Sequence, residues 1–587
     1  MKFELIFTFL VLISSSNSAL INSRGESYEC TYVTSDLFKP LVPLPPTDSP
    51  VTRCYNLELV VKDLAPDGFT RPVWTVNGQY PAPLLQANYG DRILVNVTNK
   101  YGDPASIHWH GMFQKGTNYY DGIVGVTQCE IPNKVTFLYN FTLEQYGTYW
   151  YHSHLQGQIV DGLKGPLIIY DPKDPFYGKY DYEYVMTVSD WYHTPSGILL
   201  PLFRADKYRG FDPMPDSGDI SGLGQCDCSA APKNSTCNPN NKMATYVVKK
   251  GKKYRFRIIN TSSLVHFTIS IDNHPLTIME VDGDYVKPVT LNTIPINIAQ
   301  RYSVILDANQ PIDNYKIRAH ISVCTPNNNL TINYNAPLNY DVTGILKYEG
   351  AEDKLPTSKA DSLNYTSEAC RDVNPSSLKP YYENKVPKNV ISTFKVLVTF
   401  GNLPTGKQVA LINNSSFVPN LNYPTNQQVV EGVDPYKLPP SQNAHVYECN
   451  SGDCNDAALD IYIVNNSTDS HPFHLHGHIF YILFNGENNT GIDPPNEADF
   501  NFKDPVTRDV VTVLPNSTTV IRYSVNNPGV WFFHCHIQWH LNLGMAVQMI
   551  ESPSIFKNTT IIPADVTGLC AGIDLAMNKD NKNSKTE

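Results

Sequence analysis

The sequence predicts an all-β protein that is divided into three domains. Short segments with strand character recur along the whole chain, among them residues 57–61, 93–97, 254–259 and 461–464, and Gly, Pro or Asn bounds most of them. Long runs with apolar residues at helical spacing are nearly absent. Together these two observations are typical of β-sandwiches and barrels with short connections.

Two similar strand-like endings, at residues 165–172 and 344–350, divide the chain. We therefore expect a first domain at 20–172, a second at 173–350, and a third at 351–587 that begins with an Asn-, Pro- and Ser-rich linker. A chain of 587 residues is long enough for each domain to bury its own core.

The N-terminus predicts export. Residues 1–19 have the layout of a secretory signal peptide, with Lys2 before an apolar run and small residues near Ala19. No later run of about 18 apolar residues occurs, so we expect no membrane span. Asn-x-Ser/Thr sequons recur along the chain and fit a secreted glycoprotein. We expect an extracellular monomer, in the medium or at the cell wall.

Charge and cysteine content narrow the partners and the compartment. A net charge of −11 argues against nucleic acid or an anionic membrane as the main partner, because both would repel the chain. In an oxidising compartment most of the 12 cysteines should form disulfides. Cys535 stands in a metal-ligand pattern, and the remaining eleven are an odd number. One free or intermolecular thiol is therefore expected.

The histidines are grouped in pairs. Five His-x-His pairs occur among 16 histidines, in two clusters about 320 residues apart. On an extended strand, residues i and i+2 face the same side, so each pair can present two imidazoles to one place. Imidazole binds Cu, Zn, Fe and Ni, so the spacing predicts a metal site without identifying the metal.

Cys535 narrows the choice of metal. In His534–His536 the thiolate must face away from the two flanking imidazoles, so the tripeptide serves two metal centres on opposite sides. Cys535, His540, an upstream imidazole that is most simply His471, and the thioether of Met545 would compose a His₂Cys site with a weak axial Met, which is the blue-copper type.

Four same-face pairs remain and supply eight imidazoles, enough for three further copper ions. They are His108 with His110, His152 with His154, His474 with His476, and His534 with His536. A covalent path runs from the Cys535 sulfur through the backbone to both flanking histidines. It joins the site that receives electrons to the site that passes them to an acceptor. Four copper ions can hold the four electrons that O₂ needs to become water, which predicts an oxidase of a small reducing substrate.

These motifs resemble the signature of the multicopper oxidases, and of fungal laccases most closely. The matching runs are 108–111, 149–154, 471–478 and 534–540. The resemblance implies three consecutive cupredoxin-like Greek-key domains, each a β-sandwich or barrel, and four copper ions. It implies type 1 ligands at His471, Cys535, His540 and axial Met545, type 2 ligands at His108 and His474, and type 3 ligands at His110, His152, His154, His476, His534 and His536.

The resemblance also implies roles outside the ligand set. Asp121 matches an acidic residue that feeds protons to reduced oxygen. Cys129 and Cys570 match a disulfide between the first domain and the C-terminal end. Gln538 stands where Asp or Glu is common, and because Gln carries no proton at neutral pH, the family's second proton relay is in question.

The sequence leaves the electron donor open. Asp190 resembles the laccase carboxylate that accepts a phenol proton, whereas Met545 is shared with ascorbate and bilirubin oxidases. Ferroxidases carry Asp where Ser467 stands, although Asp469 is two residues away and Asp282 is either an iron ligand or a turn residue. We expect a laccase-like enzyme acting on phenolic or diphenolic donors, with ferroxidase or ascorbate oxidase as alternatives. A copper-storage glycoprotein would have no reason to keep every ligand.

Overall fold

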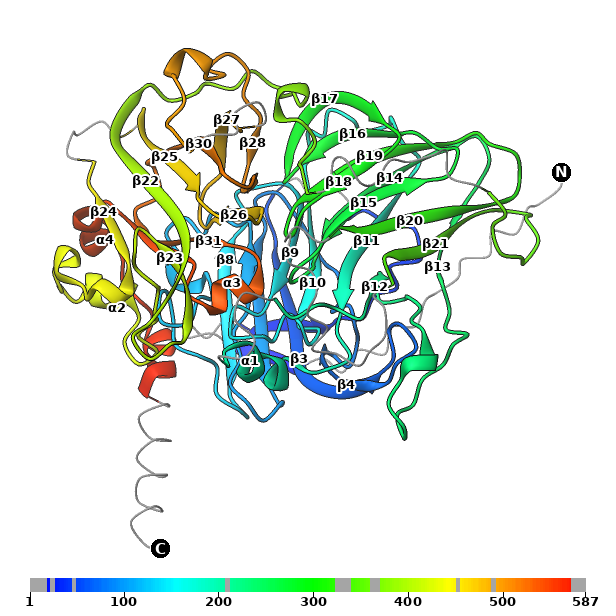
Figure 1. Cartoon of the computed structure of the whole chain (residues 1–587), viewed down its shortest axis with the longest axis horizontal. Coiled ribbons are helices and arrows are strands. Elements are labelled where there is room, and N and C mark those ends of the chain that lie inside the picture. The colour runs from blue at the N-terminus through cyan, green and yellow to red at the C-terminus, as the bar shows by residue number, and fades with distance from the viewer. Residues whose placement is uncertain are drawn as a thin grey trace, which may run out of the picture.

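The computed structural model describes residues 18–21, 27–44, 49–205, 212–322, 339–358, 370–449, 454, 456–486 and 492–571. Residues 1–17, which are most of the predicted signal peptide, lie outside these ranges. Figure 1 shows three groups of strands, with the blue and cyan N-terminal group below, the green group to one side and the yellow-to-orange group to the other. The predicted all-β class is confirmed.

The first domain consists of two sheets that pack face to face. One sheet joins β1 (Ser18–Ile21), β2 (Ser27–Tyr32), β3 (Thr52–Leu64), β6 (Arg92–Asn99) and β8 (Thr136–Thr142), with β4 (Arg71–Val76) paired to β3. The other runs in the order β5 (Leu85–Asn88), β10 (Lys164–Tyr170), β9 (Gly147–His152) and β7 (His108–His110).

The second domain repeats this plan. Its larger sheet has the order β12 (Ser217–Ile220), β11 (Tyr182–Trp191), β14 (Lys252–Asn260), β19 (Arg301–Ala308), β16 (Leu276–Val281) and β17 (Asp284–Leu291). Its smaller sheet has the order β13 (Ala244–Val248), β21 (Asp341–Tyr348), β20 (Asn314–Ser322), β15 (His266–Ile271) and β18 (Ile294–Ile296).

The third domain follows the same plan again. Its larger sheet has the order β23 (Gln408–Ile412), β22 (Asn389–Asn402), β25 (Ala457–Asn465), β30 (Ser517–Ser524), β27 (Phe480–Phe484) and β28 (Thr507–Arg508). Its smaller sheet has the order β24 (Ala444–Tyr447), β32 (Ala546–Glu551), β31 (Gly529–Cys535), β26 (His471–Leu475) and β29 (Val510–Val513).

Every one of these sheets contains a parallel pair of strands that are not consecutive in the chain, for example β3 with β6, β11 with β14 and β22 with β25. Parallel neighbours require a connection that crosses over, so the domains are Greek-key sandwiches and not simple meanders. The three sandwiches have the predicted cupredoxin-like fold. Strand pairing changes partners between Tyr170 and Tyr182 and between Tyr348 and Asn389, while the exact domain boundaries stay a prediction.

The helices are short: α1 (Ser196–Phe203), α2 (Thr425–Val430), α3 (Gln538–Asn542) and α4 (Pro553–Thr559). In the described ranges, none has the length and apolarity to cross a bilayer. One apolar core fills the first domain, and a second is continuous through the other two domains. Strands β9 and β31 are buried along their whole length, so their side chains on both faces are shielded from solvent.

The disulfide Cys129–Cys570 ties the first domain to the C-terminal segment, as predicted. Val566 and Leu569 from that segment pack into the core of the first domain. The bonds Cys30–Cys54, Cys228–Cys237 and Cys449–Cys454 are also formed, and Cys370 is disulfide-bonded. Cys226 is a thiol, which agrees with the expected odd cysteine.

Removing the tie should destabilise the fold. The double variant Cys129→Ser, Cys570→Ser loses a bond that spans 441 residues, and we expect the free energy of unfolding to fall by about 2–5 kcal/mol. Cys449→Ser, Cys454→Ser is the matched control, because its bond spans only five residues and should cost less. Thermal denaturation of the purified variants measures both. Equal melting temperatures for the first variant and the wild type would contradict this expectation.

Candidate functional site

Strand pairing brings the predicted histidines together. In the first domain, β7 and β9 place His108 opposite His152, and in the third domain β26 and β31 place His474 opposite His534. The second histidine of each pair lies two residues further on the same face. Strands β9, β26 and β31 meet near the centre of the molecule (Figure 1). Two clusters 320 residues apart in sequence thus form one site.

The eight imidazoles of this site are in mutual contact. The His476 and His534 Nε2 atoms are 3.1 Å apart, and those of His154 and His534 are 3.4 Å apart. The rings of His110 and His474 stack with centroids at 3.8 Å. All eight are buried except His154, which is half-buried. The cluster is therefore closed to bulk water on most sides.

The outer nitrogens of the rings are held by fixed acceptors. Nδ1–H of His108 donates to the Asp121 carbonyl, that of His474 to the Asp509 carbonyl, and that of His534 to the Cys535 carbonyl, at 2.8–2.9 Å. A carbonyl can only accept, so Nδ1 carries the proton and Nε2 carries a lone pair that points into the cluster.

Those inward lone pairs need a cation. Buried Nε2 atoms of five rings find no hydrogen-bond partner within the described part of the chain: His108, His110, His152, His474 and His536. Nδ1–H of His476 donates to Asp121, so the close approach of the Nε2 atoms of His476 and His534 sets two lone pairs against each other. Metal ions between the rings would turn this repulsion into coordination.

The histidines are kept neutral, as metal binding requires. Burial, reinforced by the neighbouring rings, lowers the pKa of His110, His152, His154, His474, His476 and His536 well below its usual value. The same cause lowers the pKa of His534 to about 3. At neutral pH the rings therefore have lone pairs available.

Cys535 forms a second site on the opposite face of β31. Its Sγ lies 3.5 Å from His471 Nδ1 and 3.7 Å from His540 Nδ1, and the two nitrogens are 3.1 Å apart. A point equidistant from the three atoms lies about 2 Å from each, close to the bond lengths of a transition metal to imidazole and thiolate. The Cys535 N–H donates to the carbonyl of Met545, which keeps that buried residue beside the thiolate.

A tight turn brings Asp121 against the cluster. Besides the carbonyl contact to His108, its carboxylate accepts from His476 Nδ1 at 2.9 Å and is fully buried. Gly122 makes this approach possible: its φ is +87°, and a Cβ there would overlap the carbonyl of Ile107. Asp121 thus orients one ring from each half of the site.

Asp509 is a functional neighbour that the sequence did not reveal. Its carboxylate receives two hydrogen bonds of 2.6 Å from Arg301 and lies 3.4 Å from His110 Nε2, while its carbonyl holds His474. Burial raises the pKa of Asp509 to about 6, although the charge of Arg301 lowers it. No motif surrounds this residue, and only the packing of the second domain on the third brings Arg301 to it.

Two other carboxylates from the sequence analysis are buried. Asp282 lies in the turn between β16 and β17, which is one of its two expected roles, and its carboxylate accepts from Arg508 at 2.7 Å across a domain interface. Asp190 accepts from the backbone N–H groups of Ser263 and Leu264 and is 1 % exposed. The predicted role of Asp190 as the acceptor of a phenol proton stays a prediction.

The carboxylate hydrogen-bonded to the outer nitrogen of His540 is that of Asp212. Its Oδ2 accepts from His540 Nε2 at 3.0 Å, and its side chain is 8 % exposed, compared with 2 % for the side chain of His540. Ser467 makes the equivalent contact to His471 Nε2 at 2.8 Å. Asp212 lies in a connecting segment without a recognisable motif, so the sequence contained no signal for it.

A cavity of about 630 Å³ reaches the buried cluster between the first and third domains. Its wall includes His154, Phe532, Gln538 and Glu130. The side-chain amide of Gln538 donates to the carbonyl of Gln156 on the same wall. The cavity gives a small molecule a path to one edge of the histidine cluster.

Comparison with known proteins agrees with this geometry. Multicopper oxidase family models match residues 59–174, 182–351 and 417–554. The chain is 36% identical over 544 residues to Laccase-1 of Agaricus bisporus, covering 88% of this chain and 94% of that one. It is 35% identical over 524 residues to the iron transport multicopper oxidase fio1 of Schizosaccharomyces pombe, covering 85% of this chain and 76% of that one.

Among solved structures, the laccase from Botrytis aclada superposes with a TM-score of 0.79 at 33% sequence identity, covering 90% of this chain and 93% of the other. With its paired histidines, its thiolate site and its three sandwiches, this chain belongs to the multicopper oxidase family. It is a copper-dependent oxidoreductase that uses O₂ as electron acceptor.

The two sites fit copper ions. The buried histidine Nε2 atoms that lack partners can each coordinate an ion, and so can Cys535 Sγ with the Nδ1 atoms of His471 and His540.

Neutralising Asp509 should destabilise the protein. Asp509→Asn leaves the buried guanidinium of Arg301 with the more distant Asp282, 3.6 Å away, as its remaining carboxylate, and we expect a loss of about 3–5 kcal/mol in the free energy of unfolding. Glu58→Gln, which breaks an exposed pair with Lys100, is the control and should cost less than about 1 kcal/mol. Denaturant unfolding measures both, and equal effects would refute the structural importance of the buried pair.

Proposed function

We propose that this protein is a laccase-like oxidase that takes single electrons from small phenolic or diphenolic donors and binds four copper ions. The observation that carries the proposal is the placement of Cys535 and its two flanking histidines on opposite faces of β31. When bound, copper supplies one-electron oxidation of the donor and four-electron reduction of O₂ to water. The chain's own contribution is to hold the two sites a few covalent bonds apart.

The two faces separate the Cys535 site from the cluster, and the assignment of ligands to copper types rests on the resemblance of the motifs to those of the family. His471, Cys535 and His540 hold the type 1 ion, with Met545 as the axial ligand. His108 and His474 hold the type 2 ion, and the type 3 pair is held by His110, His152, His154, His476, His534 and His536. The inward lone pairs of the second group support this assignment.

Proton delivery rests on Asp121 in this proposal. Its Oδ2 accepts from His476, while its Oδ1 is buried, makes no hydrogen bond among the described residues and lies 3.2 Å from His108 Nδ1. That oxygen can accept a hydrogen bond from a water or a reduced oxygen species inside the cluster. Gln538 lines the access cavity but carries no exchangeable acid proton, so it does not replace the acidic residue that is common at its position.

The donor docks at His540 and Asp212. The ring of His540 links the Cys535 site to the partly accessible carboxylate of Asp212, which can accept the hydroxyl proton of a phenol. Electrons then have a path from the donor through the ring of His540, and from Cys535 through the backbone to His534 and His536.

Ferroxidase activity is the second candidate, and one observation favours it. The charge of Asp212 adds to burial in raising the pKa of Asp469, so the two carboxylates lie near each other beside His540. Fe²⁺ is a hard cation that prefers such oxygen ligands. Against it, Ser467 supplies a hydroxyl and not a carboxylate next to His471.

We further propose that the protein acts outside the cell as a monomer. The predicted signal peptide, the sequons and the disulfides Cys30–Cys54 and Cys129–Cys570 support export.

Replacing the thiolate tests the core of the proposal. Cys535→Ser should lose the blue absorption band and reduce O₂ consumption with any donor to background, because the hydroxyl cannot replace the thiolate as ligand or electron path. Cys226→Ser is the matched control, since it removes the other thiol and should keep both properties. Absorption spectroscopy and an oxygen electrode report the result. A Cys535→Ser enzyme with full activity would sink the proposal.

A comparison of donors separates the two candidate activities. We expect kcat/KM for a hydroquinone to exceed that for Fe²⁺, and Asp212→Asn to lower the hydroquinone value about tenfold or more, because the proton acceptor is lost. Asp469→Asn should lower only the Fe²⁺ value. Steady-state O₂ uptake with both donors measures these effects. A wild-type preference for Fe²⁺ that Asp469→Asn abolishes would assign the enzyme to iron instead.

A further inference from the structure

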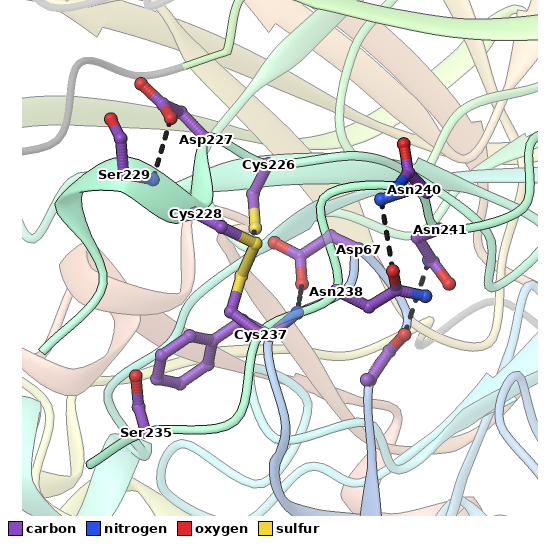
Figure 2. The surroundings of a disulfide bond; sticks show 12 residues. Asp67, Cys226, Asp227, Cys228, Ser229, Ser235, Cys237, Asn238, Asn240 and Asn241 are labelled. Atoms are coloured by element: carbon purple, nitrogen blue, oxygen red, sulfur yellow. Dashed lines mark hydrogen bonds between the residues drawn. A yellow bond between two sulfur atoms is a disulfide. The ribbon is translucent and has the colours of Figure 1, made fainter. Parts of the chain in front are cut away.

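Three sulfur atoms gather on the surface of the second domain, away from the copper ligands. The Cys228–Cys237 disulfide lies beside the thiol of Cys226, whose Sγ is 3.7 Å from Cys237 Sγ. All three sulfurs lie within 4.8 Å of one another. Figure 2 shows the Cys226 side chain directed at the disulfide. A thiol in contact with a disulfide brings together the two reactants of thiol–disulfide exchange.

The backbone anchors two of these cysteines to the same segment of the first domain. Cys226 N–H donates to the Asp67 carbonyl at 3.0 Å. The residues on either side of Cys237 are also held: Thr70 N–H donates to the Thr236 carbonyl, and Asn238 N–H donates to the Gly68 carbonyl, both at 2.9 Å. A bond between Cys226 and Cys237 would therefore join two segments that are both hydrogen-bonded to residues 67–70.

Cys228 is anchored differently. It opens a single 3₁₀ turn, η3 (Cys228–Ala230), which is capped by the exposed Asp227 through the N–H of Ser229. This turn holds itself together by local contacts and does not need the disulfide to define it. Loss of the bond at Cys228 should thus be tolerated better than loss of the bond at Cys237.

Asp67 controls the reactivity of Cys226. The thiol lies near the Asp67 carboxylate (Figure 2), which accepts from His193 Nε2 at 2.7 Å. Burial and then the Asp67 charge raise the pKa of Cys226 to about 12. Because the thiolate is the nucleophile, its fraction at neutral pH is small and rises about tenfold with each pH unit. The thiol can therefore persist beside the disulfide.

We propose that Cys226, Cys228 and Cys237 form a thiol–disulfide exchange site with two isomers. The Cys226 sulfur attacks Cys237 Sγ, the Cys226–Cys237 bond forms, and the Cys237–Cys228 bond breaks. Cys228 leaves as a thiolate and takes up the proton that Cys226 lost. One disulfide and one thiol are present before and after, so the step needs no oxidant or reductant.

The exchange moves the free thiol from Asp67 to the outer turn. In the first isomer the thiol faces the Asp67 carboxylate at the junction of two domains. In the second it belongs to Cys228, between the exposed residues Asp227 and Ser229. The second isomer is therefore the one that presents a thiol for modification by small disulfides from solvent.

The position of the alkylated cysteine tests the proposal in the wild-type protein. Holoenzyme is held at about pH 7 or about pH 9.5, quenched in acid, denatured and alkylated, and the labelled peptides are identified by mass spectrometry. We expect label on Cys226 at the lower pH, and a growing fraction on Cys228 at the higher pH with Cys237 unlabelled. Label confined to Cys226 at both values would overturn the proposal. Cys449 and Cys454 serve as the internal control and should stay unlabelled.

Two variants provide a second measurement. Cys228→Ser should form the Cys226–Cys237 bond and leave neither cysteine open to alkylation, while retaining the blue band and a melting temperature within a few degrees of wild type. Cys226→Ser should keep Cys228–Cys237 and show no label at either pH. If folded, blue Cys228→Ser protein carries label on both Cys226 and Cys237, the second isomer does not form and the proposal is wrong.

Discussion

The opposite orientation of neighbouring side chains on β31 is the constraint on which the active centre depends. Cys535 pairs with Phe473 across the sheet, and His534 pairs with His474. Side chains on paired positions share a face, so β26 also has two functional faces, with His471 on the Cys535 side and His474 on the cluster side. A shift of one residue in this register would exchange the two faces and abolish both sites.

Burial makes the centre chemically competent and also makes it costly. Desolvation keeps the imidazoles neutral, but it leaves lone pairs facing one another with no water to separate them. The chain offsets part of this cost by fixing Nδ1 of four of the rings with a carbonyl or carboxylate from Asp121, Asp509 or Cys535. The remaining repulsion is relieved only by bound cations, so copper binding and the stability of this region are coupled.

The domain interfaces do more than cover the cluster. The pairs Arg301–Asp509 and Arg508–Asp282 cross between the second and third domains, and each joins fully buried charges. Such pairs are poor sources of net stability, yet removing one partner is expensive. They therefore enforce one placement of the second domain on the third.

The sequence by itself determined the β class, the opposite faces of Cys535 and its flanking histidines, and the bond between Cys129 and Cys570, and it predicted the copper ligands, because each depends on local alternation or on a motif of high specificity. It also indicated an unpaired thiol by parity, without saying which one. The roles of Asp212, Asp509 and Arg301 were decided only by tertiary structure, since they come from different domains and carry no motif. The burial of Asp190 and its backbone N–H partners were likewise decided only by tertiary structure, because burial at one position depends on everything packed around it.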